Sequence, residues 1–393
     1  MSASVQSVWL APGAEPRLAA LVAHAWAHSP VQRARLEAAG VDPGRLSGPG
    51  ALVSLPVMRK EQLGPLQEAG RPFGDLLGEP LAQLARIFLS PGNIYDPQGP
   101  GEDYWRFSTA LRAAGFGSGD IVLNCFNYHL SPAGFIFDGA ARALGCTVIP
   151  AGVGQQEMQL QVLGDTRAQA FVGLPSYLLA LLERGRDLAL KKAFVSAEPL
   201  PPSLRTRLQA FGVDVYQGYG TADLGLVAYE CSAKAGMHLD DGVMVEICDP
   251  AGRPVPEGEV GEVVVTLLSK TYPLIRFGTG DLSALLPGPC ACGRPAPRMR
   301  GWLGRATDVI KVRGMFLYPR QLEDALAPFG AAWQARVGRD GTHRDRLIIR
   351  VEPGPAPEAV AAAVKAATRL AAEVEVGPLT PGEPRIKDGR KWE

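Results

Sequence analysis

The sequence predicts an α/β protein with a large N-terminal domain, which includes a β-rich region, and a small α+β C-terminal domain. Between about residues 118 and 216, short apolar runs alternate with helical patterns, which indicates parallel strands joined by crossover helices. From residue 243 the pattern becomes strand, turn, strand. The tail beyond residues 301–305, which read as a linker, mixes strands and helices. We therefore expect domains at residues 1–303 and 304–393.

Composition excludes several classes of protein. Of the 393 residues, 46% are apolar and 20% are charged, which is typical of a globular chain. Lys plus Arg and Asp plus Glu both number 40, so no sequence-wide field attracts nucleic acid or an anionic membrane. No charge-free apolar stretch reaches 18 residues, and the N-terminus does not resemble a secretory signal. With six cysteines in all, we expect a reduced, cytoplasmic protein.

The expected elements follow in order. The first 85 residues predict helices joined by Pro and Gly turns, most clearly at residues 16–28. Strands are expected at 120–126, 146–150, 170–174, 192–195, 213–216, 243–248, 262–268, 308–312 and 347–351. Helices are expected at 132–144, 157–163, 177–184, 202–211, 319–327 and 357–371. Because ligands of parallel sheets bind beyond the strand C-termini, polar residues that follow these strands are the candidate site.

Two glycine-containing motifs stand near strands. Residues 217–223 read QGYGTAD, in which Tyr219 offers a flat face for a base, Thr221 a hydroxyl, and Asp223 a carboxylate for Mg²⁺. Residues 278–281 read GTGD, and Asp281 can accept hydrogen bonds from both hydroxyls of a ribose. The alternative for the first motif is a plain glycine-rich turn, and for the second a hairpin turn with a local acceptor. The residues leave both alternatives open.

These motifs, followed by Gly304-Arg305 and residues 308–314, resemble the adenylate-forming superfamily of acyl-CoA synthetases, and most closely its phenylacetate–CoA ligase branch. Residues 287–294, PGPCACGR, are particularly typical of that branch, and the resemblance covers nearly the whole chain. It implies that ATP and Mg²⁺ activate a small, aromatic carboxylic acid as an acyl-adenylate. The C-terminal domain would then rotate as a mobile lid, and CoA would displace AMP to give a thioester.

The resemblance also implies roles for individual residues. Tyr219 would stack on adenine, Asp223 (usually Glu in the family) would hold Mg²⁺, Asp281 would hold the ribose, and Arg305 would contact the nucleotide. The remaining nucleotide-binding candidates are Ser196, Ala197, Glu198, Pro199, Gln217, Gly220, Thr221 and Ala222. The candidates for an aryl pocket are Phe126, Tyr128, Gly134 and Pro175, for which ordinary core packing stays open.

The chain departs from the family in two places. The phosphate loop, roughly SSGTTGxP in the family, is SPGNIYDP at residues 90–97, so both threonines are missing and Asp96 adds a negative charge. Pro91 also removes a backbone N–H donor. The catalytic lysine of the family follows a glycine near the C-terminus. If that glycine is Gly382, Glu383 replaces the lysine; if it is Gly389, Arg390 does, with Lys391 next to it.

These departures leave two functions open. The first is an AMP-forming acyl-CoA ligase with Asp223, Arg390 and Lys391 as catalytic candidates. The alternative is a non-ligase relative that binds AMP, acyl-adenylate or acyl-CoA without turning over ATP. In both cases the expected partners are a small carboxylic acid and CoA, with no nucleic acid and no membrane. A homodimer stays open.

Four side chains suggest a structural zinc site. Cys231 and His238 are seven residues apart, and Cys290 and Cys292 are two apart, which gives a Cys₃His set suited to Zn²⁺. The branch commonly has a comparable set. The alternative is four unrelated side chains.

Overall fold

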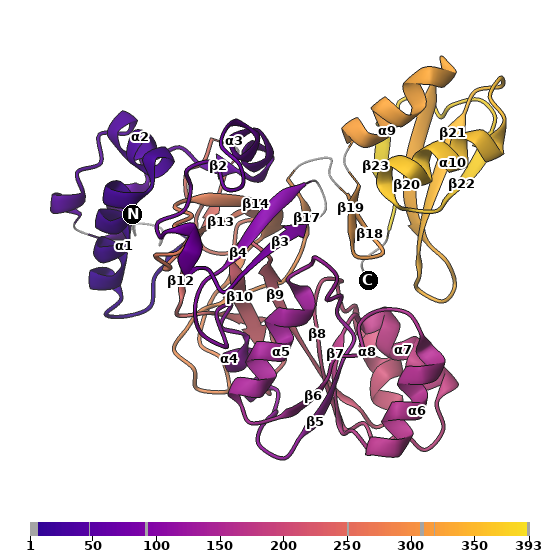
Figure 1. Cartoon of the computed structure of the whole chain (residues 1–393), viewed down its shortest axis with the longest axis horizontal. Coiled ribbons are helices and arrows are strands. Elements are labelled where there is room, and N and C mark those ends of the chain that lie inside the picture. The colour runs from indigo at the N-terminus through magenta and orange to yellow at the C-terminus, as the bar shows by residue number, and fades with distance from the viewer. Residues whose placement is uncertain are drawn as a thin grey trace. The chain divides into compact units, whose positions relative to one another are not determined.

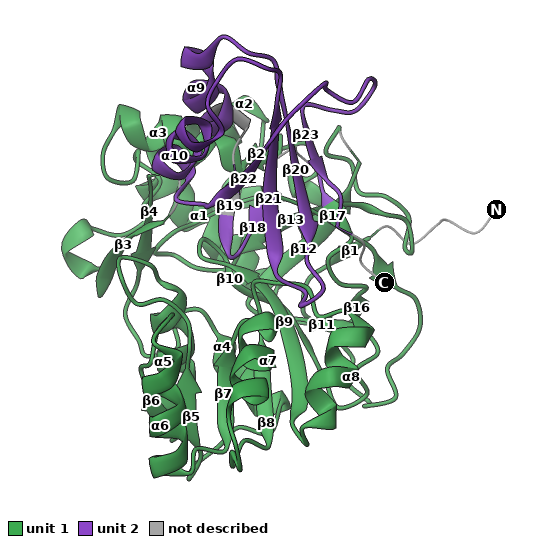
Figure 2. Ribbon diagram, turned by 90° about the vertical axis from the view of Figure 1, so that its right-hand side faces the viewer, with its two compact units in different colours: residues 1–304 green, residues 305–393 purple. Residues whose placement is uncertain are grey.

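The computed structural model describes residues 7–46, 48–90, 93–249, 251–306, 310–317 and 319–390, without the side chains of Phe316, Pro319 and Arg320. The chain divides into two compact units, residues 1–304 and 305–393 (Figure 2). The sequence analysis placed the boundary between residues 303 and 304. Among the described residues, no helix is long and apolar enough to cross a membrane.

In the part of the chain that the structure describes, a mixed sheet of nine strands, parallel in one half and antiparallel in the other, forms the centre of unit 1 (Figure 1). Its order is β15-β16-β11-β10-β9-β8-β7-β5-β6, and neighbours from β9 to β6 pair in parallel. The parallel strands are β5 (Ile121–Asn124), β6 (Thr147–Ile149), β7 (Ala170–Gly173), β8 (Lys192–Val195) and β9 (Asp214–Thr221). The antiparallel ones are β10 (Gly225–Glu230), β11 (Met237–Leu239), β15 (Leu285–Leu286) and β16 (Arg298–Met299).

Helices cover both faces of this sheet because successive strand residues point to opposite sides. Val122, Ala170, Val172 and Phe194 pack on one face with α4 (Phe107–Ala113) and α5 (Ala133–Ala143). The alternate residues Leu123, Phe171, Ala193, Val195 and Val215 pack on the other face with α6 (Gln156–Thr166), α7 (Pro175–Arg184) and α8 (Pro202–Ala210). The predicted α/β class is confirmed.

A second sheet of unit 1 is mainly antiparallel. Its order is β1-β12-β13-β14-β17, and β2 pairs with β14 in parallel. The strands are β1 (Val8–Trp9), β2 (Met58–Arg59), β12 (Val243–Cys248), β13 (Gly261–Leu267), β14 (Phe277–Ser283) and β17 (Gly304–Arg305). A separate hairpin consists of β3 (Arg86–Ser90) and β4 (Ile94–Gln98), and the N-terminal helices are α1 (Glu15–His28), α2 (Pro30–Ala38) and α3 (Leu63–Ala69).

Unit 2 is a small α+β body with its own apolar core. Its sheet has the order β22-β21-β20-β23, beside the hairpin β18-β19. The strands are β18 (Ile310–Val312), β19 (Met315–Leu317), β20 (Trp333–Arg339), β21 (Asp345–Val351), β22 (Ala372–Val376) and β23 (Ile386–Asp388), and the helices are α9 (Pro319–Leu326) and α10 (Pro357–Thr368). The start of the strand expected at 308–312 lies outside the described residues.

Both glycine-containing motifs lie largely within strands rather than in turns. β9 continues to Thr221, five residues beyond the predicted end, because its antiparallel pairing with β10 extends the ladder. β14 contains the whole of residues 278–281, and the expected linker at 301–305 ends in β17. The first motif is therefore fixed by strand pairing, and the second lies where the pairing of β13 with β14 is irregular.

A buried cation, Arg276, holds the N-terminal loops against the second sheet. Its side chain is 1% exposed and pairs with Glu246 on β12, Nε to Oε2 2.9 Å. The guanidinium also donates to the carbonyl oxygens of Val53 (2.9 Å), Leu55 (2.6 Å) and Gly252 (2.6 Å). These bonds offset the cost of removing both charges from water.

We expect Arg276→Met to destabilise unit 1 by about 3–5 kcal/mol, because it leaves the Glu246 carboxylate buried without its cation. Calorimetric melting checks this. The matched control is Arg207→Met, whose ion pair with Glu183 is 38% and 45% exposed and should contribute about 0–1 kcal/mol. Equal melting temperatures for the two variants would show that Arg276 does not anchor these loops.

Candidate active site

Two of the predicted nucleotide-binding residues meet, although they lie in different sheets. The Tyr219 hydroxyl on β9 donates to Asp281 Oδ2 on β14 at 2.8 Å, across 62 residues of sequence. The Trp302 indole N–H donates to the other carboxylate oxygen, Oδ1, at 3.0 Å. Asp281 is 7% exposed, so the two donors fix the orientation of an almost buried carboxylate. Trp302 was missed because residues 301–305 were read as a linker.

The rest of the 217–223 motif is held by its neighbours. Gln217 is bound through its backbone N–H and its side-chain amide to the Glu230 carboxylate, at 3.0 and 2.9 Å. At Gly220 a Cβ would lie 2.4 Å from the carbonyl oxygen of Gly225, so only glycine allows β10 to approach this closely. The Thr221 hydroxyl accepts the Leu224 N–H at 3.2 Å, which closes the turn.

The turn is also fixed from outside. The Trp105 indole N–H donates to the Ala222 carbonyl oxygen at 3.1 Å. Asp223, the next residue, is thereby presented at a constant position beyond the end of β9. A carboxylate held in this way needs little rearrangement to bind a ligand.

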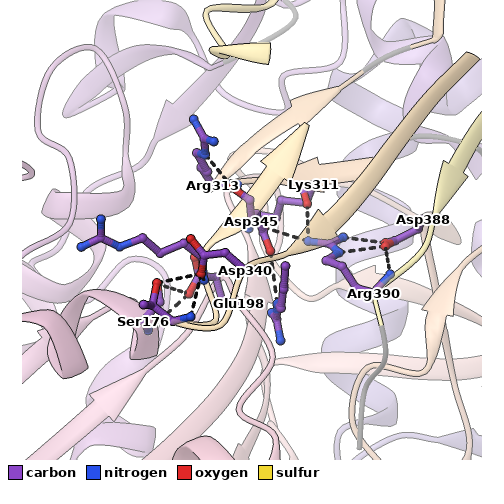
Figure 3. Close-up of polar contacts among 11 residues, drawn as sticks. Ser176, Glu198, Lys311, Arg313, Asp340, Asp345, Asp388 and Arg390 are labelled. Atoms are coloured by element: carbon purple, nitrogen blue, oxygen red, sulfur yellow. Dashed lines mark hydrogen bonds and ion pairs between the residues drawn. The ribbon is translucent and has the colours of Figure 1, made fainter. Parts of the chain in front are cut away.

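The segment 196–199 follows β8 and lies against the same motif. The Ser196 hydroxyl donates to the Gly218 carbonyl oxygen at 2.9 Å. Ala197 has φ of +69°, an uncommon left-handed conformation for a residue with a side chain. Glu198 Oε2 accepts the Ser176 hydroxyl at 2.7 Å (Figure 3). Pro199 completes the segment, which follows β8, the neighbour of β9 in the sheet.

Phe126 and Pro175, two of the predicted aryl-pocket residues, belong to the core. The Phe126 ring stacks on Phe137 with centroids 4.4 Å apart, and it is 5% exposed. Pro175 is buried in the first turn of α7. Both positions suit the ordinary packing that the sequence analysis left open.

Tyr128 and Gly134 face each other. A Cβ on Gly134 would lie 2.6 Å from the Tyr128 ring, so the ring rests directly on the start of α5. The Tyr128 hydroxyl accepts from the Asn124 amide at 2.8 Å and donates to Asp138 at 3.1 Å. The ring is therefore held in one plane and can form a flat wall.

Asp223 lies near a second buried carboxylate, that of Asp96, and near the Lys60 ammonium. Lys60 Nζ lies 2.5 Å from Asp223 Oδ2. Asp96 on β4 is 1% exposed. Its burial, and then the charge of Asp223, raise the pKa of Asp96 to about 7, against an opposing effect of Lys60. The sequence analysis had expected Asp96 beside the phosphates, but its proximity to Asp223 depends on tertiary contacts.

In unit 2 the Arg390 side chain is 4% exposed and already bound. It contacts Asp345 Oδ2 at 2.9 Å, Asp388 Oδ2 at 2.6 Å and the carbonyl oxygen of Lys311 at 2.8 Å (Figure 3). This arrangement fixes the end of β23. Lys391, the other catalytic candidate, lies outside the described residues.

The four candidate zinc ligands lie together beside the antiparallel strands β10, β11 and β15 of the central sheet. The ligand atoms of Cys231, His238, Cys290 and Cys292 all lie within 4.8 Å of one another. Cys231 Sγ is 3.6 Å from Cys290 Sγ, close to the ~3.8 Å edge of a tetrahedron with Zn–S bonds of about 2.3 Å. Cys292 Sγ is 3.3 Å from His238 Nε2.

The surroundings of the cluster suit a metal. His238 Nδ1 lies 2.7 Å from the Ala296 carbonyl oxygen, so Nδ1 carries the hydrogen and the Nε2 lone pair faces the sulfurs. The backbone N–H of Cys292 lowers the pKa of Cys290 to about 6, whereas burial raises the pKa of Cys231 to about 11. The fit to zinc therefore rests on the convergence of three sulfurs and one imidazole nitrogen within 4.8 Å.

Comparison with known proteins identifies the family. Residues 110–267 match the family model described as AMP-binding enzyme. The chain is 34% identical over 362 residues to phenylacetate-coenzyme A ligase of Thermus thermophilus, covering 86% of this chain and 80% of the relative. It is 32% identical over 361 residues to the same enzyme of Escherichia coli, with the same two coverages.

A solved structure supports the fold and the resemblance drawn from the motifs. A crystal structure of 2-hydroxyisobutyryl-CoA ligase, in complex with 2-HIB-AMP and CoA, superposes with a TM-score of 0.87 at 26% identity, covering 98% of this chain and 91% of that one. The resemblance stated above is thus confirmed. The chain belongs to the phenylacetate–CoA ligase family of AMP-forming acyl-CoA ligases.

Proposed function

We propose that this ligase activates a small aromatic carboxylic acid, with adenosine monophosphate bound around Tyr219 and Asp281. The observation that carries the proposal is the contact of Tyr219 on one sheet with Asp281 on the other, 2.8 Å. It brings an aromatic face and a carboxylate together in the C-terminal part of β9, near the strand end at which parallel sheets bind ligands.

The nucleotide would be held by groups that already have fixed orientations. The Tyr219 ring would lie against the adenine, beside the segment 196–199. Asp281 would accept the ribose hydroxyls, because an ionised carboxylate can accept several hydrogen bonds at once. Arg305, on the strand after Trp302, would contact the phosphate. Preorganised donors and acceptors avoid an ordering cost when the nucleotide binds.

The reaction would proceed in two displacements. A carboxylate oxygen of the acid attacks the α-phosphorus of ATP, and pyrophosphate leaves with the electron pair of the broken P–O bond. The deprotonated CoA sulfur then attacks the acyl carbon, and AMP leaves as the thioester forms. Mg²⁺ held by Asp223 would neutralise the charge on the phosphates.

For the basic catalytic group, Lys391 is favoured over Arg390. The Arg390 guanidinium is occupied by Asp345 and Asp388, which suits a positioning role for the end of β23. Loss of pyrophosphate release in Lys391→Ala, with release retained in Arg390→Ala, supports this assignment; the reverse pattern contradicts it.

The acid would lie against the Tyr128 ring. The ring is held in its plane by Asn124 and Asp138, and Gly134 leaves room for it. A flat, partly buried ring favours a planar aryl group over a short aliphatic chain, because stacked rings gain about 0.5–1.5 kcal/mol beyond the area that they bury.

The test is a panel of aryl and short aliphatic acids, scored by pyrophosphate release and by CoA thioester formation. We expect aryl acids to have the highest kcat/KM. Gly134→Val should raise the KM for aryl acids at least tenfold, because its Cβ displaces the Tyr128 ring. Gly164→Val on α6, where a Cβ meets nothing within 4 Å, is the matched control and should leave KM unchanged.

Two outcomes of this panel contradict the proposal. A preference for short aliphatic acids would remove the aromatic substrate class. Absence of thioester with every acid, while AMP still raises the melting temperature, would favour the relative that binds AMP without turning over ATP.

We also propose that Cys231, His238, Cys290 and Cys292 bind a structural Zn²⁺, which ties β11 to the loop after β15. We expect about one zinc per chain by metal analysis of purified protein. Cys290→Ser should lose the zinc and lower the melting temperature by several degrees. Cys125→Ala removes a buried thiol outside the cluster and should keep the metal. Metal-free wild-type protein with an unchanged Cys290→Ser melting temperature would contradict the site.

A further inference from the structure

Asp96 is an acidic residue whose side chain is almost completely buried. It lies on β4, opposite Phe88 of β3, and is 1% exposed. Neither of its carboxylate oxygens has a hydrogen-bond partner with good geometry in the described part of the chain. The neighbouring Ser90 hydroxyl lowers the pKa of Asp96 slightly, but it donates to the Ile94 carbonyl oxygen at 3.1 Å. An ionised carboxylate buried without partners costs several kcal/mol, so a bound cation or a proton is expected to neutralise it.

The neighbours of Asp96 do not supply enough positive charge. Asp223 acts on Asp96 as a second carboxylate, and its Oδ1 also lacks a hydrogen-bond partner among described residues. Lys60, bound to Asp223 Oδ2, is the cation that acts on the pair. Tyr272 is fully buried near both carboxylates. Its burial, and then the charges of Asp223 and Asp96, raise the pKa of its hydroxyl, so this group adds no charge. With both carboxylates ionised, two negative charges would face the Lys60 ammonium in the described part of the chain, which gives a net charge of −1.

The donor set favours a hard divalent cation as the missing charge. Three carboxylate oxygens, two from Asp96 and one from Asp223, are buried in one region without hydrogen bonds. Mg²⁺ and Mn²⁺ prefer such oxygens, and they are usually held by one or two carboxylates together with water and substrate phosphates. The same carboxylates would otherwise share a proton.

We propose that Asp96 and Asp223 together bind one divalent cation, and that they do so before any nucleotide is present. Asp96 thereby becomes a ligand of the metal rather than a charge that repels ATP, and the metal would attract the phosphates that the altered loop at residues 90–97 no longer cradles. The proposal rests on the proposed function only for placing ATP beside this cluster. Its cation-binding part depends on the geometry of unit 1 alone.

The test is a titration of the full chain with Mn²⁺, without acid, ATP or CoA, in which free Mn²⁺ is followed by electron paramagnetic resonance. We expect about one Mn²⁺ per chain for the wild type, and at least tenfold weaker binding for Asp96→Asn. Asp103→Asn is the matched control. In the described part of the chain Asp103 also has a buried oxygen without a hydrogen-bond partner, but its other oxygen accepts the Ser108 N–H in the first turn of α4, and it should not affect Mn²⁺.

Thermal melting guards against a folding defect. Mg²⁺ should raise the melting temperature of the wild type and of Asp103→Asn, but not that of Asp96→Asn, which should melt at or above the metal-free wild type because a buried charge is removed. If Asp96→Asn does not fold, Asp96→Glu replaces it; retained Mn²⁺ binding supports the site, and lost binding contradicts it.

Two results overturn the inference. The first is wild-type protein that binds no Mn²⁺ without nucleotide, which would mean that a proton neutralises the carboxylate pair. The second is Asp96→Asn protein that binds Mn²⁺ as the wild type does. Either result leaves the proposed function standing if acid-dependent pyrophosphate release persists, so the two failures are distinguishable.

Discussion

The hydrogen bond between Tyr219 and Asp281 joins two sheets that are otherwise built from different parts of the chain. Tyr219 is fixed by the pairing of β9 with β10, and Asp281 lies in an irregular stretch of β14, where its N–H donates to the Thr279 hydroxyl at 3.1 Å. The Trp302 indole completes the arrangement by binding the second carboxylate oxygen. The candidate nucleotide site therefore depends on the packing of two sheets, and the surrounding motifs gain their positions from that packing.

Buried charge is treated in two ways within unit 1. Arg276 has Glu246 and three backbone carbonyl oxygens as partners, so its charge is compensated by the protein itself. Among the described residues Asp96 has no such set, although it is equally buried. A chain that buries a charge without a partner favours a ligand of opposite charge, since binding then removes a cost that is already present in the folded protein.

Much of the fold could be predicted because local patterns agree with the tertiary structure. The strand at 192–195 and the crossover helices around it follow from alternation and helical spacing, and these segments are buried on both sides in the sheet. The continuation of β9 through Tyr219 to Thr221 could not be read locally. Glycine at 218 and 220 suggested a turn, whereas the glycines admit Phe194 and β10 at close range.

Site residues that belong to a sequence motif were predicted, and site residues that are brought in only by tertiary contacts were missed. Tyr219, Asp281 and the Cys231–His238–Cys290–Cys292 cluster were named from residue type and order. Trp302 was not, because nothing in residues 301–305 indicates which side chain it contacts. The approach of Asp96 to Asp223 was also hidden, since it requires the β3–β4 hairpin and the end of β9 to meet.

The most direct test of the account is calorimetric titration of the full chain with AMP, comparing wild type with Asp281→Asn and with Asp249→Asn, a carboxylate on the loop after β12. If Asp281 binds the ribose, Asp281→Asn should weaken AMP binding at least tenfold, while Asp249→Asn should match the wild type. Equal AMP affinity for wild type and Asp281→Asn would contradict a nucleotide site centred on Tyr219 and Asp281.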